Sequence, residues 1–223
     1  MGCGRTDAMV HASQFFFHLD ASEPWEFDMV FRINKVLPAD IAVFDIIPAH
    51  NKQHARFDAS HRTYDYFLHT RKDPFLAQLS ALYLERNLNL DAMKKGVMLL
   101  TRYNDFRAFC KTPDDYNTTI CNVTQTALYT DLTGEKIRFQ ISANRYLGRM
   151  IRLLMARLLA IGRGDISVDE FENYLITKIP PKKFEAAYPQ GLYLSKVSYP
   201  YLDMPACSTF SFMEQSGGCW KPV

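Results

Sequence analysis

The sequence lacks the residue patterns of a disulfide scaffold, a zinc site or a membrane protein. Its five cysteines are odd in number, and no two of them have the C-x-x-C spacing of zinc or redox sites. No stretch approaches the ~20 apolar residues that cross a bilayer, and no signal peptide is recognisable. These absences predict a cytoplasmic protein with reduced thiols and no membrane partner.

Glycine-rich phosphate loops and nucleophile triads are also missing. His50 and His54 have the i, i+4 spacing of a helical metal site. However, cysteine and carboxylate partners at ligand spacing are absent, and Arg56, which lies between His54 and His61, would repel a cation. We therefore expect neither a bound metal nor a cofactor.

Length and composition permit a substantial core but do not identify a partner. The chain has 223 residues, of which 48% are hydrophobic, which suffices for one large domain or two small ones. Its net charge of +2 is only mildly basic, so the total charge alone does not indicate nucleic-acid binding.

The local distribution of charge is more informative. Residues 136–164 contain seven lysines and arginines and no acidic residue. A solvated helix face normally mixes both signs of charge. The segment therefore predicts a surface that faces the phosphates of RNA.

Hydrophobic periodicity predicts an α+β protein with a largely antiparallel sheet. An alternating pair of segments around Thr133-Gly134 predicts a hairpin. Arg145, Arg149 and Arg152 would share one helix face if their helix begins early enough. The predicted strands cover residues 14–19, 41–47, 63–69, 124–131, 136–143 and 192–199, and the predicted helices cover 27–36, 91–100, 146–161 (ending at Gly162) and a segment opened by the capping box Ser167-x-x-Glu170.

Residues 4–8 (GRTDA) place Asp7 beside Arg5 on a short polar turn. A carboxylate there can act as a nucleophile or as a base, while the nearby cation keeps it ionised and can hold a phosphate. Arg-x-Asp also occurs in ordinary surface turns. Taken alone, the motif leaves both interpretations open.

Three segments match the motifs of one enzyme family in the same order. They are residues 4–12 (GRTDAMVHA), residues 54–66 (HARFDASHRTYDY) and residues 143–152 (ANRYLGRMIR). The first resembles the catalytic loop of the tRNA pseudouridine synthases of the TruA type, the second that family's ARF segment, and the third the start of a helix with an active-site arginine. With weaker matches at 105–109 and 191–200, the resemblance covers nearly the whole chain.

The resemblance implies a pseudouridine synthase fold with two sheet-bearing halves and a cleft between them. The halves would be residues 1–55 and 56–205, followed by a loose tail over 206–223. It further implies a homodimer that, without a cofactor, isomerises uridines 38, 39 and 40 in the anticodon stem-loop of tRNA.

Particular residues inherit roles from this resemblance. Asp7 would be the catalytic carboxylate, Tyr64 the residue that stacks on the target base and assists proton transfer, and Arg152 the partner of the carboxylate. Tyr66 shares the strand face of Tyr64 and would be structural. Arg5 would contact a phosphate or help to flip the base, Arg56 would be structural or contact RNA, and Leu192 or Leu194 would pack against the target base or belong to the core. The acid-free segment adds Arg145 and Arg149, and Tyr146 completes the predicted RNA contacts.

Isomerisation of uridine breaks the C1′–N1 bond, turns the base and joins C1′ to C5. The carboxylate would either attack C1′, as in retaining glycosidases, or remove the C2′ proton to give a glycal. The sequence leaves both routes open. In either case the target uridine has to leave its stack to reach Asp7.

Two departures from the family pattern lead to further expectations. Met9 stands where the family usually has glycine, which would cost about 1 kcal/mol or more if the backbone φ is positive there. The family also carries some fifty residues before this loop, so we expect a member shortened at its amino end, with an unpaired edge at residues 14–19.

Two other functions stay open, the first because of these departures. One is a non-catalytic RNA-binding relative. The other is an enzyme acting on small nucleosides, which the acid-free arginine segment disfavours because a small substrate does not need so many cations.

Overall fold

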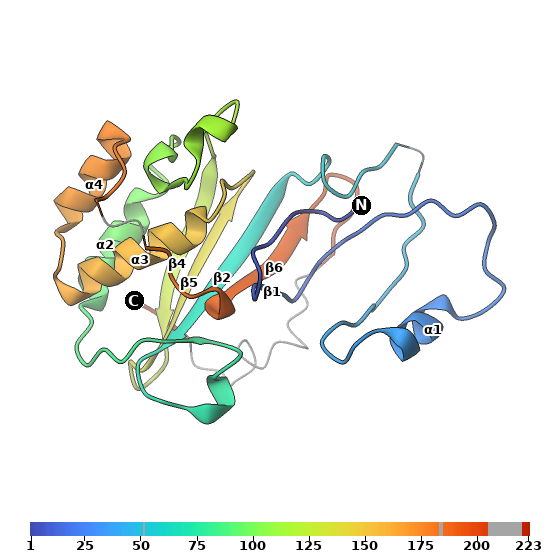
Figure 1. The fold of residues 1–223 in the computed structure, drawn as a ribbon, viewed down its shortest axis with the longest axis horizontal. Helices are drawn as coiled ribbons and strands as arrows, with labels where there is room; N and C mark the ends of the chain where they lie inside the picture. Colours follow the sequence, from blue (N-terminus) through green and yellow to red (C-terminus); the bar gives the residue numbers. More distant parts are fainter. Residues whose placement is uncertain (51, 183–184, 205–219) are drawn as a thin grey trace.

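The computed structural model describes residues 1–50, 52–182, 185–204 and 220–223 (Figure 1). Within them, three helices pack on one face of a single seven-stranded, mostly antiparallel sheet, which confirms the α+β class. The strands are β1 (His11–Ala12), β2 (His61–His69), β3 (Ala81–Leu82), β4 (Val123–Thr130), β5 (Lys136–Ala143), β6 (Leu192–Ser198) and β7 (Lys221–Pro222), and the helices are α1 (Met29–Val36), α2 (Leu90–Leu99), α3 (Met150–Arg163) and α4 (Val168–Thr177).

The sheet runs in the order β1-β6-β2-β5-β4-β7, with β3 beside β2. Helices α2, α3 and α4 cover one face, whereas α1 and its connections extend away from the sheet (Figure 1). Residues 1–55 contribute only β1 and α1 to these elements. In the described part of the chain, no helix has the length and apolarity to cross a membrane.

Strand β2 is the centre of the sheet and is buried on both faces. It pairs with β5 on one side and with β6 on the other. Tyr64 and Tyr66 lie in the core shared with the helices, whereas Phe67 belongs to a separate cluster with Tyr193. The predicted alternation of this strand is confirmed.

Asp65 is a fully buried carboxylate that joins three strands. It accepts hydrogen bonds from Arg138 Nε (2.7 Å) and Gln140 Nε2 (3.0 Å) of β5, and from Ser195 Oγ of β6. A buried carboxylate persists only when it is paired and hydrogen-bonded. Arg138, one of the seven cations of residues 136–164, is therefore bound inside the sheet.

Helix α3 differs from its predicted bounds at both ends. It begins at Met150 rather than Tyr146, and Arg149 before it has a φ of 61°. At the other end α3 continues past Gly162. This glycine permits close packing against α2, since a Cβ there would lie 2.7 Å from Met93 Sδ. Gly164, with a φ of 79°, ends α3 instead.

This change of bounds overturns the predicted basic helix face. Arg145 and Arg149 precede α3, and only Arg152 lies on it. The i, i+4, i+7 stripe is therefore wrong.

The predicted strand over residues 41–47 is also wrong. Among the described residues these positions form no strand; the side chain of Asn34 in α1 donates to Val43 O (2.7 Å) and accepts from Val43 N (2.8 Å). A strand needs a partner for its backbone groups, and here a side-chain amide takes that place. Its apolar residues, such as Phe44, remain half-exposed.

The predicted strand over residues 14–19 is not among the strands of the sheet. The prediction that its edge is unpaired is wrong, because backbone groups of this segment are hydrogen-bonded. Cys3 N donates to Phe16 O (2.7 Å), and His18 N donates to Met1 O (3.1 Å). On the other side, Gln14 Oε1 accepts from Val197 N of β6 (2.8 Å). The first residues of the chain thus provide the pairing that the prediction left open.

The remaining elements follow the sequence closely. The hairpin β4–β5 and the helices α1, α2 and α4 are confirmed, including the capping bond from Glu170 N to Ser167 Oγ. Of the predicted loose tail, residues 206–219 lie outside the described residues. Lys221 and Pro222 pair with β4, and Trp220 lies 5.9 Å from Phe67 between ring centroids.

Replacement of Asp65 tests the buried network. Asp65→Ala removes a fully buried carboxylate that accepts hydrogen bonds from Arg138, Gln140 and Ser195, so we expect a loss of about 3–5 kcal/mol in the free energy of unfolding by denaturant titration. Arg71→Ala, which removes an exposed ion pair with Glu135, should cost under about 1 kcal/mol. Equally small losses in both variants would show that the Asp65 network stabilises the fold no more than an exposed ion pair does.

Candidate active site

Asp7 lies on a short loop that is held at both ends. Before it, Arg62 donates to Cys3 O from Nε (3.3 Å) and Nη2 (2.6 Å). After it, β1 pairs in parallel with β6, and His11 stacks on Tyr193 with ring centroids 4.5 Å apart. The two anchors fix the position of the carboxylate relative to the sheet.

The loop turns sharply after Asp7. Val10 N donates to Asp7 O (3.3 Å), and Met9 occupies the third position of the turn with a φ of 65°. A positive φ at that position is typical of turns that prefer glycine. The loop therefore keeps the conformation that a glycine would adopt without strain, and Met9 costs about 1 kcal/mol or more.

The carboxylate of Asp7 forms an ion pair with Arg152 of α3. Arg152 Nη1 lies 2.5 Å from Asp7 Oδ2. The side chain of Arg152 is 13% exposed and that of Asp7 36%, so the carboxylate remains accessible to a substrate. Arg152 also donates from Nε to Ala187 O (2.7 Å), which fixes the orientation of its guanidinium.

Tyr64 of β2 lies beside this pair. Burial raises the pKa of its hydroxyl to about 12, with the charge of nearby Asp7 adding to the rise and Arg62 opposing it. The phenol therefore keeps its proton at neutral pH and is a weaker acid than an ordinary tyrosine. The Tyr64 ring meets Tyr146 edge-on, with centroids 5.1 Å apart.

Tyr146 and Tyr66 have inward-facing hydroxyls. The Tyr146 hydroxyl lies 3.0 Å from Arg62 O and 2.9 Å from Ile141 O and shares its one hydrogen between them, and Tyr66 donates to Tyr188 O (2.8 Å). Burial raises the pKa of both hydroxyls above the usual tyrosine range. Tyr66 is fully buried, as a structural role requires.

Leu192, another predicted contact, lies next to Tyr66 across β6 and β2 and is 7% exposed. Arg5, Arg56 and Arg149 are exposed, and Arg145 is partly buried. In the described residues these four arginines form no ion pair with a carboxylate.

The acid-free segment 136–164 does not form one phosphate-facing surface as predicted. Carboxylates from other parts of the chain pair with several of its arginines: Asp65 with Arg138, Asp7 with Arg152, and Glu85 and Asp165 with Arg163. A segment can lack acids in sequence and still meet them in space.

Sequence reasoning missed Arg62. Besides Cys3 O, its guanidinium reaches Arg56 O (3.0 Å) and Asn144 O (3.5 Å). It thereby connects the residue before the first motif segment with the second and third segments. Arg62 lies within the second motif segment, but a basic residue at the start of an alternating strand is indistinguishable in sequence from a solvated charge, so the sequence assigned it no role.

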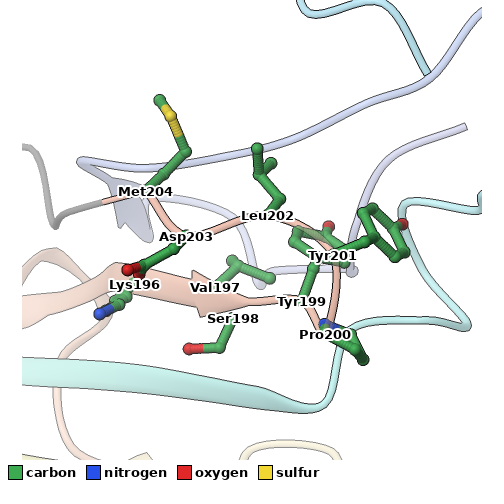
Figure 2. A pocket seen from close by; sticks show the side chains of 9 residues that line it. All are labelled: Lys196, Val197, Ser198, Tyr199, Pro200, Tyr201, Leu202, Asp203 and Met204. Atoms are coloured by element: carbon green, nitrogen blue, oxygen red, sulfur yellow. The ribbon is translucent and has the colours of Figure 1, made fainter.

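A separate hollow of about 430 Å³ lies along the end of β6 and the turn that follows it (Figure 2). Tyr199 and Tyr201 lie together at one end, and Lys196 and Asp203 at the other. It contains none of the predicted site residues, so the chemistry does not depend on it.

Arg62→Ala tests the anchoring of the loop. Loss of the charged donors leaves Cys3 O, on a fully buried residue, without its partner, so the free energy of unfolding should fall by about 1–3 kcal/mol. Arg62→Lys keeps one donor and should lose less. If denaturant titration finds both variants as stable as the parent, Arg62 does not anchor the loop.

Comparison with known proteins agrees with this geometry. A family model described as tRNA pseudouridine synthase matches residues 103–200. The protein named tRNA pseudouridine synthase A of Parabacteroides distasonis is 39% identical over 203 residues, which cover 90% of this chain and 79% of that protein. Proteins of the same name from Porphyromonas gingivalis and Bacteroides fragilis are each 37% identical, again over 90% of this chain and 80% and 79% of their own lengths. A chain that carries these motifs, this sheet and this degree of identity belongs to the tRNA pseudouridine synthase family.

Proposed function

We propose that this chain isomerises uridine to pseudouridine in tRNA and that Asp7 is the group that acts on the ribose. The ion pair between Asp7 and Arg152 carries the proposal, because it presents an accessible carboxylate whose orientation is fixed by a nearly buried guanidinium. An ordinary surface turn has no need of such a partner from a distant helix.

The neighbouring residues supply the remaining requirements of the reaction. Asp7 either attacks C1′ or removes the C2′ proton, and the C1′–N1 bond breaks in both routes. The base turns and C1′ joins C5. As this bond forms, the Asp7–C1′ bond breaks in the first route and C2′ takes back its proton in the second, and in both routes N1 gains a proton and C5 releases one. Tyr64, which holds its proton at neutral pH, stacks on the base, and its hydroxyl passes its own proton on as it accepts the proton from C5.

Tyr146 supports this arrangement from behind. Its ring packs edge-on against Tyr64, and its hydroxyl is hydrogen-bonded to backbone carbonyls. In this proposal Tyr146 therefore positions Tyr64 and its hydroxyl does not contact RNA. Leu192, nearly buried beside Tyr66, forms part of the floor of the site.

The proposed substrate is the anticodon stem-loop of tRNA. Arg5 and Arg56 are exposed near the Cys3–Arg62 anchor of the Asp7 loop, and Arg145 and Arg149 precede α3, whose first turn carries Arg152. Cations on both sides of the carboxylate suit a backbone that bends to deliver a flipped nucleotide. The chemistry needs no cofactor, and both the homodimer and the cytoplasmic location stay predictions.

Asp7→Asn is the decisive variant. It should abolish tritium release from tRNA labelled at C5 of uridine while leaving tRNA affinity within a few-fold, because the amide keeps the shape and loses the charge. Asp114→Asn, which alters an exposed carboxylate paired with Arg107, is the matched control and should retain activity.

Two results would contradict the assignment. Substantial turnover in Asp7→Asn would remove Asp7 from the chemistry. Binding of tRNA by the unmodified chain without any tritium release would favour the non-catalytic RNA-binding relative.

The proposed RNA contacts predict a specific dependence on salt. Replacement of Arg145 and Arg149 by Gln should lower the slope of log affinity against log salt concentration by up to roughly two units, since two phosphate contacts are lost. Arg71→Gln with Arg163→Gln is the matched control, because Arg71 follows the end of β2 and Arg163 is the last residue of α3, at the end far from Arg149. An unchanged slope in the first double variant would place the RNA elsewhere.

A further inference from the structure

The segment Ala187–Tyr188 is held unusually firmly for a connection between elements. Ala187 N donates to Arg152 O (3.0 Å), and Ala187 O accepts from Arg152 Nε (2.7 Å). Tyr188 N donates to Tyr83 Oη (3.0 Å), and Tyr188 O accepts from Tyr66 Oη (2.8 Å). All four backbone polar groups of the two residues are therefore bonded.

The side chain of Tyr188 nevertheless faces outward. It is 52% exposed, although its ring stacks on Tyr83 with centroids 5.1 Å apart and an angle of 28° between the planes. Since Tyr83 covers one face of the ring, the exposed half includes the other face. The ring is thus a fixed aromatic surface with one side open.

Its place in the fold relates this surface to the chemistry. The residue before Tyr188 holds the guanidinium that binds Asp7. Arg152 also lies near enough to the Tyr83 hydroxyl to oppose the rise that burial causes in its pKa. The stacked pair Tyr83–Tyr188 therefore borders the catalytic ion pair.

We propose that the open face of Tyr188 is a stacking subsite for an RNA base next to the target uridine. This subsite depends on the function proposed above, the modification of tRNA. When a nucleotide leaves its stack, its neighbours lose their partners, and an ordered aromatic ring replaces the lost contact at little entropic cost. Packing does not require this exposure, because Tyr83 and Tyr66 hydrogen-bond residue 188 through its backbone, and Tyr83 covers only one face of its ring.

The binding test uses a fluorescein-labelled anticodon stem-loop RNA and fluorescence anisotropy. Tyr188→Ala should bind this RNA roughly 5- to 100-fold more weakly, the range found for loss of one stacked base. Tyr188→Phe and Tyr188→Trp should bind as the parent does, since they keep the ring. Tyr174→Ala, in α4 away from the site, is the control and should not change the affinity.

A second experiment identifies the base. Stem-loop RNAs with one abasic position, at either neighbour of the target uridine, should bind the parent more weakly at one of the two positions. With that RNA, Tyr188→Ala should cause no further loss, because the partner of the ring is already absent. Kinetically, Tyr188→Ala should raise KM for tRNA and leave kcat within a few-fold.

The outcomes separate this proposal from the proposed function. Parental affinity in Tyr188→Ala, equal further losses with all RNAs, or a fall in kcat at constant KM would overturn the subsite while leaving the synthase activity intact. A lowered melting temperature in Tyr188→Ala together with weak binding in Tyr188→Phe would assign the residue a structural role instead. Failure of the unmodified chain to bind tRNA would refute the proposed function itself.

Discussion

The ion pair between Asp7 and Arg152 is the contact on which the site depends. It joins residues 145 positions apart in the chain, and the same guanidinium binds the carbonyl of Ala187. One planar side chain thus brings the start of the chain, helix α3 and the approach to β6 together. Because the guanidinium is only 13% exposed, solvent screens this interaction less than it would an exposed pair. The Asp7 loop, which has little secondary structure of its own, gains a defined position in this way.

Strand β2 places Tyr64 beside the ion pair between Asp7 and Arg152. Its alternation directs Tyr64 and Tyr66 to the core under the helices and Asp65 to the opposite face, where β5 and β6 supply the partners of the carboxylate. A slip of one residue in register would move a carboxylate into the helix-covered core and the tyrosines out of it. The Asp65 network therefore opposes such a slip, and the position of Tyr64 beside Asp7 depends on it.

Rigidity and strain are unevenly distributed around the site. Arg62 binds backbone carbonyls of three separate segments, and two tyrosine hydroxyls bind residue 188, so the surroundings of the carboxylate are fixed. Within this frame Met9 keeps a left-handed backbone that a glycine would adopt more easily. A site that has to receive a nucleotide outside its stack benefits from such fixed surfaces, because little ordering remains to be done on binding.

The sequence by itself determined the family, the α+β class and most elements, because alternation, capping residues and the motifs around Asp7, Tyr64 and Arg152 are local patterns. It did not reveal that residues 41–47 lack a partner strand, that Gly162 serves packing rather than termination, or that carboxylates from elsewhere pair with Arg138 and Arg163. It also assigned no role to Arg62, although that residue lies in a matching motif, or to Tyr188. Only the tertiary structure decided these features, since each depends on which groups from distant parts of the chain meet, and a local pattern does not contain that information.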